Sequence, residues 1–125
     1  MFQNLDVFKT AMAMARHAGT QQAYSAQNIA NADTPGYRAK ELVNFSTGLS
    51  SQMTAQKATR STHLHGTLGH NVDFKERDRP LDPNGNTVSL EAEMVKSVGA
   101  KRQHDRALAI YRSSLNILRT SLGRQ

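Results

Sequence analysis

The sequence contains no cysteine and no tryptophan, and only three of its 125 residues are proline. Without cysteine, the chain can form no disulfide bond, thiolate nucleophile or cysteine metal site. Hydrophobic residues make up 38% of the chain and aromatic residues 6%. A chain of this length and composition has room for one domain with a thin core. We therefore expect an elongated fold, or one that depends on partners.

Long hydrophobic runs are absent as well. No stretch of the sequence approaches the roughly 20 apolar residues that span a bilayer, so we expect no membrane insertion. The first residues, Met1 to Asp6, have neither a basic start nor an apolar run. They do not resemble a cleaved secretory signal.

The formal net charge of +6 is unevenly distributed. Residues 1–35 are neutral, residues 36–87 carry +2 and residues 88–125 carry +4. The basic residues of the last segment are spread along it and form no dense block. They suit a solvated or partner-facing helix face. A small basic helical protein that binds nucleic acid is the alternative.

The first 30 residues have the pattern of a long helix. Apolar or small residues recur at alternating steps of four and three, as in a heptad seam, although Gly19 and Gln22 weaken its centre. The seam positions are Met1, Leu5, Phe8, Met12, Ala15, Gly19, Gln22, Ala26 and Ile29. A helix of about 30 residues would be roughly 45 Å long. Because the rest of so small a chain cannot cover it, some of its surface should contact other molecules.

The last segment predicts a second long helix. Ser89 is a good N-cap, and Glu91 and Glu93 would lie in the first turn, where the helix dipole favours acidic side chains. Its seam positions are Leu90, Met94, Ser97, Lys101, His104, Leu108, Tyr111, Leu115, Leu118 and Leu122. The polar residues in the middle of this seam would weaken a simple dimer, and they could set the register or meet a polar partner.

The segment between the helices is polar and rich in turn formers. We expect Leu42, Val43 and Phe45 to anchor it on the helices, residues 71–74 to pair as a short strand, and residues 75–79 to form a solvated surface. The predicted fold is mainly α, with long N- and C-terminal helices (1–33 and 87–125) packed as a coiled-coil-like pair. An irregular, partly extended middle segment (34–86), with room for short β-strands, joins them into one discontinuous helical domain.

Catalytic and metal-binding patterns are weak. His63, His65 and His70 have metal-ligand chemistry, but a polar loop in contact with neighbouring subunits explains them better than zinc or nickel binding. The acidic residues of the middle segment lie beside basic ones, so ion pairing explains them better than acid–base catalysis. These acids are Asp73, Glu76, Asp78 and Asp82. We expect no enzyme, cofactor, bound metal or small-molecule substrate.

The most specific stretch lies where the first helix should stop. Asn28 and Asn31 are poor helix formers whose amides can bond to backbone, and Pro35 disfavours helical geometry at Thr34, so the helix should end near residue 32. Pro35 and Gly36 fit the central positions of a type II turn, which requires a positive φ at the glycine.

The order of residues here resembles the Asn-x-x-Asn-x-x-Thr-Pro-Gly-Tyr signature of bacterial flagellar axial proteins, the family of rod and hook subunits. The matching residues are Asn28, Ile29, Ala30, Asn31, Thr34, Pro35, Gly36, Tyr37 and Ala39. Gln27 departs from the pattern, since many relatives have asparagine there. Residues 86–94 are similar to the segment that opens the C-terminal helix of proximal-rod members. The small size of the chain also favours these members, among which the B-type subunit matches best and the C-type is an alternative.

This resemblance implies a structural subunit of the flagellar basal body that polymerises through its terminal helices into the proximal rod, the drive shaft of flagellum-dependent motility. It implies export by the flagellar type III apparatus without a cleaved signal, and a location in the rod within the periplasmic space. The expected partners are copies of itself, other rod subunits, and membrane-ring, export-gate and rod-adaptor proteins, with no nucleic acid. An adaptor of the export machinery is a further alternative.

Two sets of residues are expected to form the packing and assembly contacts. The first is the motif, with an expected role in assembly: Asn28, Ile29, Ala30, Asn31, Thr34, Pro35, Gly36 and Tyr37. The second is a helix-packing interface comprising Leu5, Phe8, Met12, Ala15, Gly19, Ala26, Leu90, Met94, Leu108, Tyr111, Leu115, Leu118 and Leu122.

Overall fold

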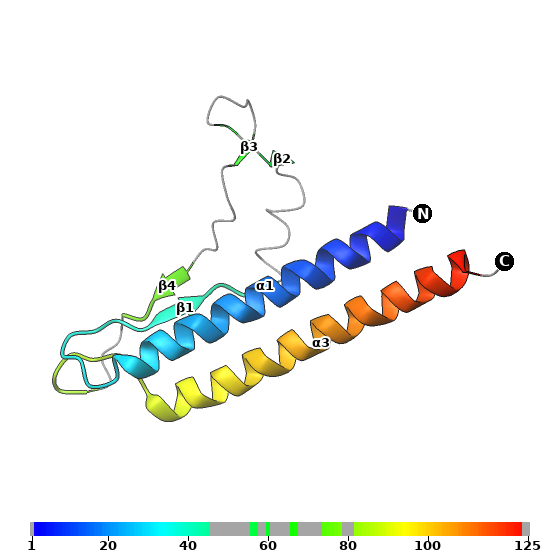
Figure 1. Cartoon of the computed structure of the whole chain (residues 1–125). Coiled ribbons are helices and arrows are strands. Elements are labelled where there is room, and N and C mark those ends of the chain that lie inside the picture. Colours follow the sequence, from blue (N-terminus) through cyan, green and yellow to red (C-terminus); the bar gives the residue numbers. More distant parts are fainter. Residues whose placement is uncertain are drawn as a thin grey trace.

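Two long helices dominate the computed structural model, which describes residues 2–45, 56–57, 60, 66–67, 74–78 and 82–123. Helix α1 spans Phe2–Ala30 and helix α3 spans Leu90–Leu122. They lie side by side and antiparallel, with both chain termini at the same end (Figure 1). Their 29 and 33 residues correspond to lengths of about 44 and 50 Å. The predicted mainly α fold with a packed pair of terminal helices is confirmed.

Small side chains fill the contact between the two helices. Buried positions recur every seven residues on both, at Ala11, Ala18 and Ser25 of α1 and at Glu93, Ala100 and Ala107 of α3. A seven-residue repeat keeps one stripe of a helix facing its partner when the pair supercoils. Because most of these side chains are short, the two backbones can approach closely.

One side-chain contact near each end joins the two helices. The rings of Phe8 and Tyr111 meet edge to face, with 5.3 Å between their centroids, near the termini. At the other end, Asn28 Nδ2 donates to Glu93 Oε2 at 3.1 Å. The alanines at positions 11, 18, 100 and 107 lie between these two contacts.

The buried stripe is displaced by one residue from part of the predicted seam. Met12, Gly19 and Ala26 are exposed, and the residues just before them are buried instead. On α3, Leu90, Met94 and Leu122 are exposed. The half-buried positions of the predicted seams are Phe8, Ala15, Ile29, Ser97, His104, Leu108, Tyr111, Leu115 and Leu118. Hydrophobicity favoured Met12 over the smaller Ala11, and the alternating steps of four and three carried the same displacement on to Gly19 and Ala26. The side chain of Leu5 lies outside the described part.

Short strands lie beside the helix pair. Strand β1 (Lys40–Leu42) pairs antiparallel with β4 (Phe74–Glu76), with Lys40 opposite Glu76 and Leu42 opposite Phe74. Strands β2 (Gln56–Lys57) and β3 (Gly66–Thr67) form a second, parallel pair. Of the strand predicted at residues 71–74, only Phe74 is described, and it begins β4.

Side chains of α1 contact the residues that directly follow β1. His17 Nε2 lies 2.8 Å from the carbonyl oxygen of Val43, and its ring meets that of Phe45 edge to face, with 5.5 Å between centroids. The ring of Tyr24 lies 5.8 Å from that of Phe74 in β4. As predicted, Val43 and Phe45 thus anchor the start of the middle segment on the first helix.

The end of α1 follows the local sequence closely. The helix ends at Ala30, two residues before the predicted point. Tyr37 N donates to Thr34 O at 3.3 Å, and Gly36 has φ = 70°. This is the hydrogen bond and the positive φ that the predicted Pro35-Gly36 turn requires. Ser89 caps α3 as predicted, accepting a hydrogen bond from Ala92 N.

In the part of the chain that the structure describes, neither helix contains a stretch apolar enough to cross a membrane.

Candidate assembly site: a buried polar network

The largest fully buried side chains are all polar, and all lie near the end where α1 stops and α3 starts. They are Asn28, Asn86, Thr87 and Glu93, none more than 2% exposed. We call these four residues, together with Tyr37, Glu41, Arg77 and Lys96, the polar network. It joins α1, α3, β1, the turn after α1 and the segment before α3 (Figure 1).

Asn28 uses its whole amide group. Its Nδ2 donates to the carbonyl of Lys40 at 2.9 Å and to Glu93 Oε2 at 3.1 Å. Its Oδ1 accepts from the backbone N–H of Lys40 at 3.0 Å and from the hydroxyl of Tyr37 at 3.3 Å. One asparagine side chain therefore connects α1 to β1, to the turn and to α3. The prediction that Asn28 bonds to backbone is confirmed.

The Asn86 side chain donates to carbonyl groups of the turn that follows α1. Its Nδ2 lies within hydrogen-bond distance of the carbonyls of Asn31 (3.0 Å), Ala32 (2.6 Å) and Thr34 (2.9 Å). Its Oδ1 accepts from Val88 N at 2.7 Å. This bond bends the chain just before α3 begins. The carbonyls of Asn31 and Thr34 also accept from the backbone N–H groups of Thr34 and Tyr37. The Asn86 amide therefore adds a second bond to each and holds the turn after α1 against the segment before α3.

Thr87 and Arg77 tie the adjacent segments together. Thr87 Oγ1 accepts from the backbone N–H of Ala39 at 2.7 Å, and its own N–H donates to the carbonyl of Tyr37 at 3.1 Å. The backbone N–H of Arg77 donates to the carbonyl of Ala39 at 2.9 Å, and its guanidinium reaches the carbonyl of Thr87 at 3.3 Å. The segments on either side of the middle region therefore lie against each other.

Two acids and two bases balance one another within the network. The Glu93 carboxylate lies 3.4 Å from Lys96 Nζ and 3.6 Å from Arg77. The Glu41 carboxylate lies 2.8 Å from the same Lys96 and 3.7 Å from Arg77. A carboxylate as deeply buried as that of Glu93 is tolerated only when it is paired and hydrogen-bonded. Asn28, Lys96 and Arg77 meet that condition.

Two side chains of the network have shifted pKa values. The hydrogen bond from Lys96 lowers the pKa of Glu41 below its ordinary value, and the charges of Lys96 and Arg77 add to this effect. Burial raises the pKa of Tyr37, and the negative charges of Glu93 and Glu76 raise it further. Both shifts stabilise the protonation states on which the network depends: an ionised Glu41 and a neutral Tyr37 hydroxyl that donates to Asn28.

The buried polar atoms of the network are all hydrogen-bonded, which leaves none free to bind or react with a ligand. Within the described residues, no buried side-chain nitrogen or oxygen lacks a hydrogen-bond partner, and no group of three or more His, Asp or Glu side chains could hold a metal ion. The three histidines considered for metal binding, at positions 63, 65 and 70, lie outside the described part.

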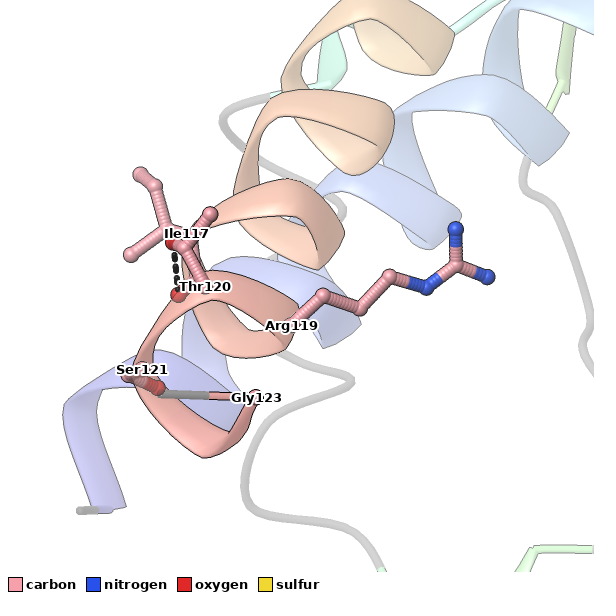
Figure 2. A pocket seen from close by; sticks show the side chains of 5 residues that line it. All are labelled: Ile117, Arg119, Thr120, Ser121 and Gly123. Carbon is pink, nitrogen blue, oxygen red and sulfur yellow. Dashed lines mark hydrogen bonds between the residues drawn. The ribbon is translucent and has the colours of Figure 1, made fainter. Parts of the chain in front are cut away.

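A hollow at the C-terminal end of α3 has no converging polar groups. Ile117, Arg119, Thr120, Ser121 and Gly123 line it. Figure 2 shows that Ile117 and Arg119 extend in opposite directions from the helix, while Thr120 turns back to donate to the carbonyl of Ile117 at 2.9 Å. Such a surface does not resemble a small-molecule site, in which a few polar groups point at one ligand.

The structure separates the motif residues into two groups. Asn28 is buried, and Ile29, Asn31 and Tyr37 are half-buried. Ala30, Thr34, Pro35 and Gly36 are exposed on the turn. Asn28 and Tyr37 of the first group belong to the polar network, and the exposed group is available to another molecule.

Sequence reasoning missed the central role of Glu93, Asn86 and Thr87. Glu93 was assigned to the first turn of α3 for its charge alone, and residues 75–79 were expected to be solvated. Lys75, Glu76 and Asp78 are exposed as predicted, and Asp78 pairs with Arg38 at 3.5 Å. Arg77, in contrast, turns inward to Glu41 and Glu93. The similarity of residues 86–94 to a rod-protein segment was the signal that could have found these three.

The fold and the site define a class of structural protein in which the two ends of the chain form one antiparallel helix pair, fastened by a polar network around an Asn-x-x-Asn-x-x-Thr-Pro-Gly-Tyr motif. No family model matches the chain. It is, however, 32% identical over 120 residues to the flagellar basal body rod protein FlgB of Agrobacterium fabrum, covering 89% of this chain and 88% of that protein. The chain therefore belongs to the FlgB family of flagellar basal body rod proteins.

Proposed function

We propose that this protein is a structural subunit of the proximal rod of the bacterial flagellum and that it polymerises through α1 and α3. Apolar surface that the single chain leaves uncovered carries this proposal. On α3, Leu90, Met94, Val95, Val98, Ile117 and Leu122 are each between 49 and 79% exposed. Exposed apolar surface of this extent marks sites of association.

Family membership supports the rod as the place of this association, since the relative is a basal body rod protein. It favours the rod over the nucleic-acid-binding alternative, whose support was the basic character of the last segment. Copies of this chain, other rod subunits, and the ring, export-gate and adaptor proteins of the basal body are the proposed partners.

The thin core supports export of an unfolded chain by the flagellar type III apparatus into the periplasmic rod. The buried hydrophobic residues of the described part are five alanines and one valine: Ala11, Ala18, Ala39, Ala100, Ala107 and Val88. Burying an alanine methyl contributes only about 0.8 kcal/mol. A helix pair with such a core would unfold readily before export and gain further burial on assembly.

Site-specific cross-linking in intact basal bodies tests the proposal. Because the chain has no cysteine, a single cysteine placed at Met12, Thr34 or Ile117, all exposed, would be its only thiol. We expect cross-links from all three positions to axial subunits of the flagellum. Cross-links confined to soluble cytoplasmic proteins would contradict the proposal, whatever the behaviour of the purified chain.

A further inference from the structure

We propose that the polar network selects the register in which α1 packs on α3. Ala11 and Ala18 are equivalent positions one heptad apart on α1, and so are Ala100 and Ala107 on α3. Sliding one helix along the other by seven residues, about 10.5 Å, would bring alanine opposite alanine again. The small-residue seam by itself therefore fits several registers almost equally well.

The aromatic contact near the termini does not remove this ambiguity. Phe8 meets Tyr111 there, and both side chains are only half-buried. His104, another half-buried aromatic ring, lies one heptad before Tyr111. A slide by one heptad in one direction would exchange this ring contact for one between Phe8 and His104. In the other direction Phe8 would move towards Leu118, another half-buried side chain.

The network, in contrast, fits one register only. Glu93 accepts from Asn28 on α1. One heptad earlier lies Gln21, which is half-buried and whose amide is one methylene farther from the backbone, so it cannot take the place of Asn28 in the same bonds. In a slid pair, the Glu93 carboxylate would face the alanine-lined part of α1 or pass beyond the helix end. It would lose Asn28 in either case. A buried charge without its partners is strongly disfavoured.

Asn86 and Thr87 oppose the same slide through the backbone. Asn86 holds the segment before α3 to the carbonyls of Asn31, Ala32 and Thr34, and Thr87 holds it to Tyr37 and Ala39. Moving α3 by one heptad would break these bonds together. Polar groups placed at one point of an otherwise apolar helix contact are known devices for fixing register.

Disulfide formation between paired cysteines measures the register directly. In the purified full chain, Ala18→Cys with Ala100→Cys reports the observed register. Ala18→Cys with Ala107→Cys, and Ala11→Cys with Ala100→Cys, report slides in the two directions, since a displacement of about 10 Å exceeds disulfide reach. Each pair is made with the intact network, with Glu93→Ala plus Asn86→Ala, and with Glu91→Ala. The last is a matched control, because it removes an exposed acid from the same first turn.

With the intact network and with Glu91→Ala, we expect the first pair to oxidise at least about tenfold faster than the other two. With Glu93→Ala plus Asn86→Ala, that preference should fall about tenfold while far-UV circular dichroism still shows helix. An unchanged preference would overturn the proposal. Equal rates with the intact network, or loss of helix in the double variant, would also overturn it, because the network would then not choose among registers. None of these results bears on assembly into the rod.

Discussion

Asn28 joins α1 to three other parts of the fold. Its amide bonds to β1, to the turn and to α3, and the side chain is 1% exposed. Asparagine suits this position because one planar amide offers two donors and two acceptors. Aspartate has the same shape but would lose both donors and place a second carboxylate beside Glu93.

Replacing Asn28 should therefore be costly. Asn28→Ala leaves the backbone groups of Lys40 and the Glu93 carboxylate short of partners, and we expect a loss of about 3 kcal/mol in the free energy of unfolding. Urea unfolding followed by circular dichroism measures it. Gln27→Ala, at an exposed neighbouring position on the same helix, should change the free energy by less than about 0.5 kcal/mol. Equal effects of the two variants would show that the amide contributes little.

The lowered pKa of Glu41 predicts how the stability of the fold changes as the pH falls. Lys96 lowers its pKa below the ordinary value of 4.5 in the folded chain. A carboxyl group whose folded pKa is depressed contributes stability that is fully present above its unfolded pKa and is lost as pH falls through the folded pKa. Between about pH 5 and about pH 3, the unfolding free energy of Glu41→Gln should therefore fall less than that of the unchanged chain.

A second variant assigns this effect to the ion pair. In a Lys96→Met background, the hydrogen bond that is the largest cause of the shift is absent. Adding Glu41→Gln there should alter the acid sensitivity much less than it does in the unchanged chain. If Glu41→Gln has the same effect in both backgrounds, Lys96 is not the cause.

At the scale of elements, side-chain size decides which stripes of α1 and α3 meet. Ala18 is 0% exposed and Ala100 is 1% exposed, so neither position has room for a larger residue. Met12 and Met94 carry more apolar surface, yet both are exposed. A close contact along two long helices therefore leaves the larger apolar side chains on the outside.

Alanine-to-leucine substitutions distinguish the buried stripe from the predicted seam. Ala18→Leu inserts three carbon atoms into a closed contact and should destabilise the isolated chain by about 1–3 kcal/mol. Ala26→Leu, at an exposed position of the predicted seam, should leave the stability of the isolated chain within about 0.5 kcal/mol of its starting value. Thermal unfolding by circular dichroism compares them. The reverse order of effects would mean that the helices pack along the predicted seam.

Features that depend on neighbouring residues could be predicted from the sequence. The Ser89 cap and the turn at Gly36 follow from side-chain and backbone chemistry within four residues. The burial of Glu93 could not be predicted, because Asn28 and Arg77 lie far from it in the chain and only the fold brings them within 3.6 Å. The seam was misplaced by one residue because hydrophobicity ranks Met12 above Ala11, whereas close packing prefers the smaller side chain.

The molecule combines one end that is held by hydrogen bonds and ion pairs with a long surface of exposed apolar side chains. The polar network holds the end where α1 stops and α3 starts, while α3 leaves apolar side chains exposed along its length. Within the described residues, every buried polar side-chain atom has a hydrogen-bond partner, whereas apolar side chains of α3 stay exposed. This division suits a subunit that takes up one internal arrangement and completes its burial against other molecules.

A charge placed on the open surface should therefore affect assembly and leave the single chain intact. Val95 is 73% exposed, so Val95→Asp should change the unfolding free energy of the isolated chain by less than about 0.5 kcal/mol. In the rod, the same change would place an unpaired carboxylate in an apolar contact, and we expect motility in soft agar to be reduced or lost. Gln103→Asp, at an exposed polar position of the same helix, adds the same charge away from the apolar side chains and should preserve motility. Normal swimming of cells that carry Val95→Asp would show that this part of α3 stays uncovered in the assembled rod.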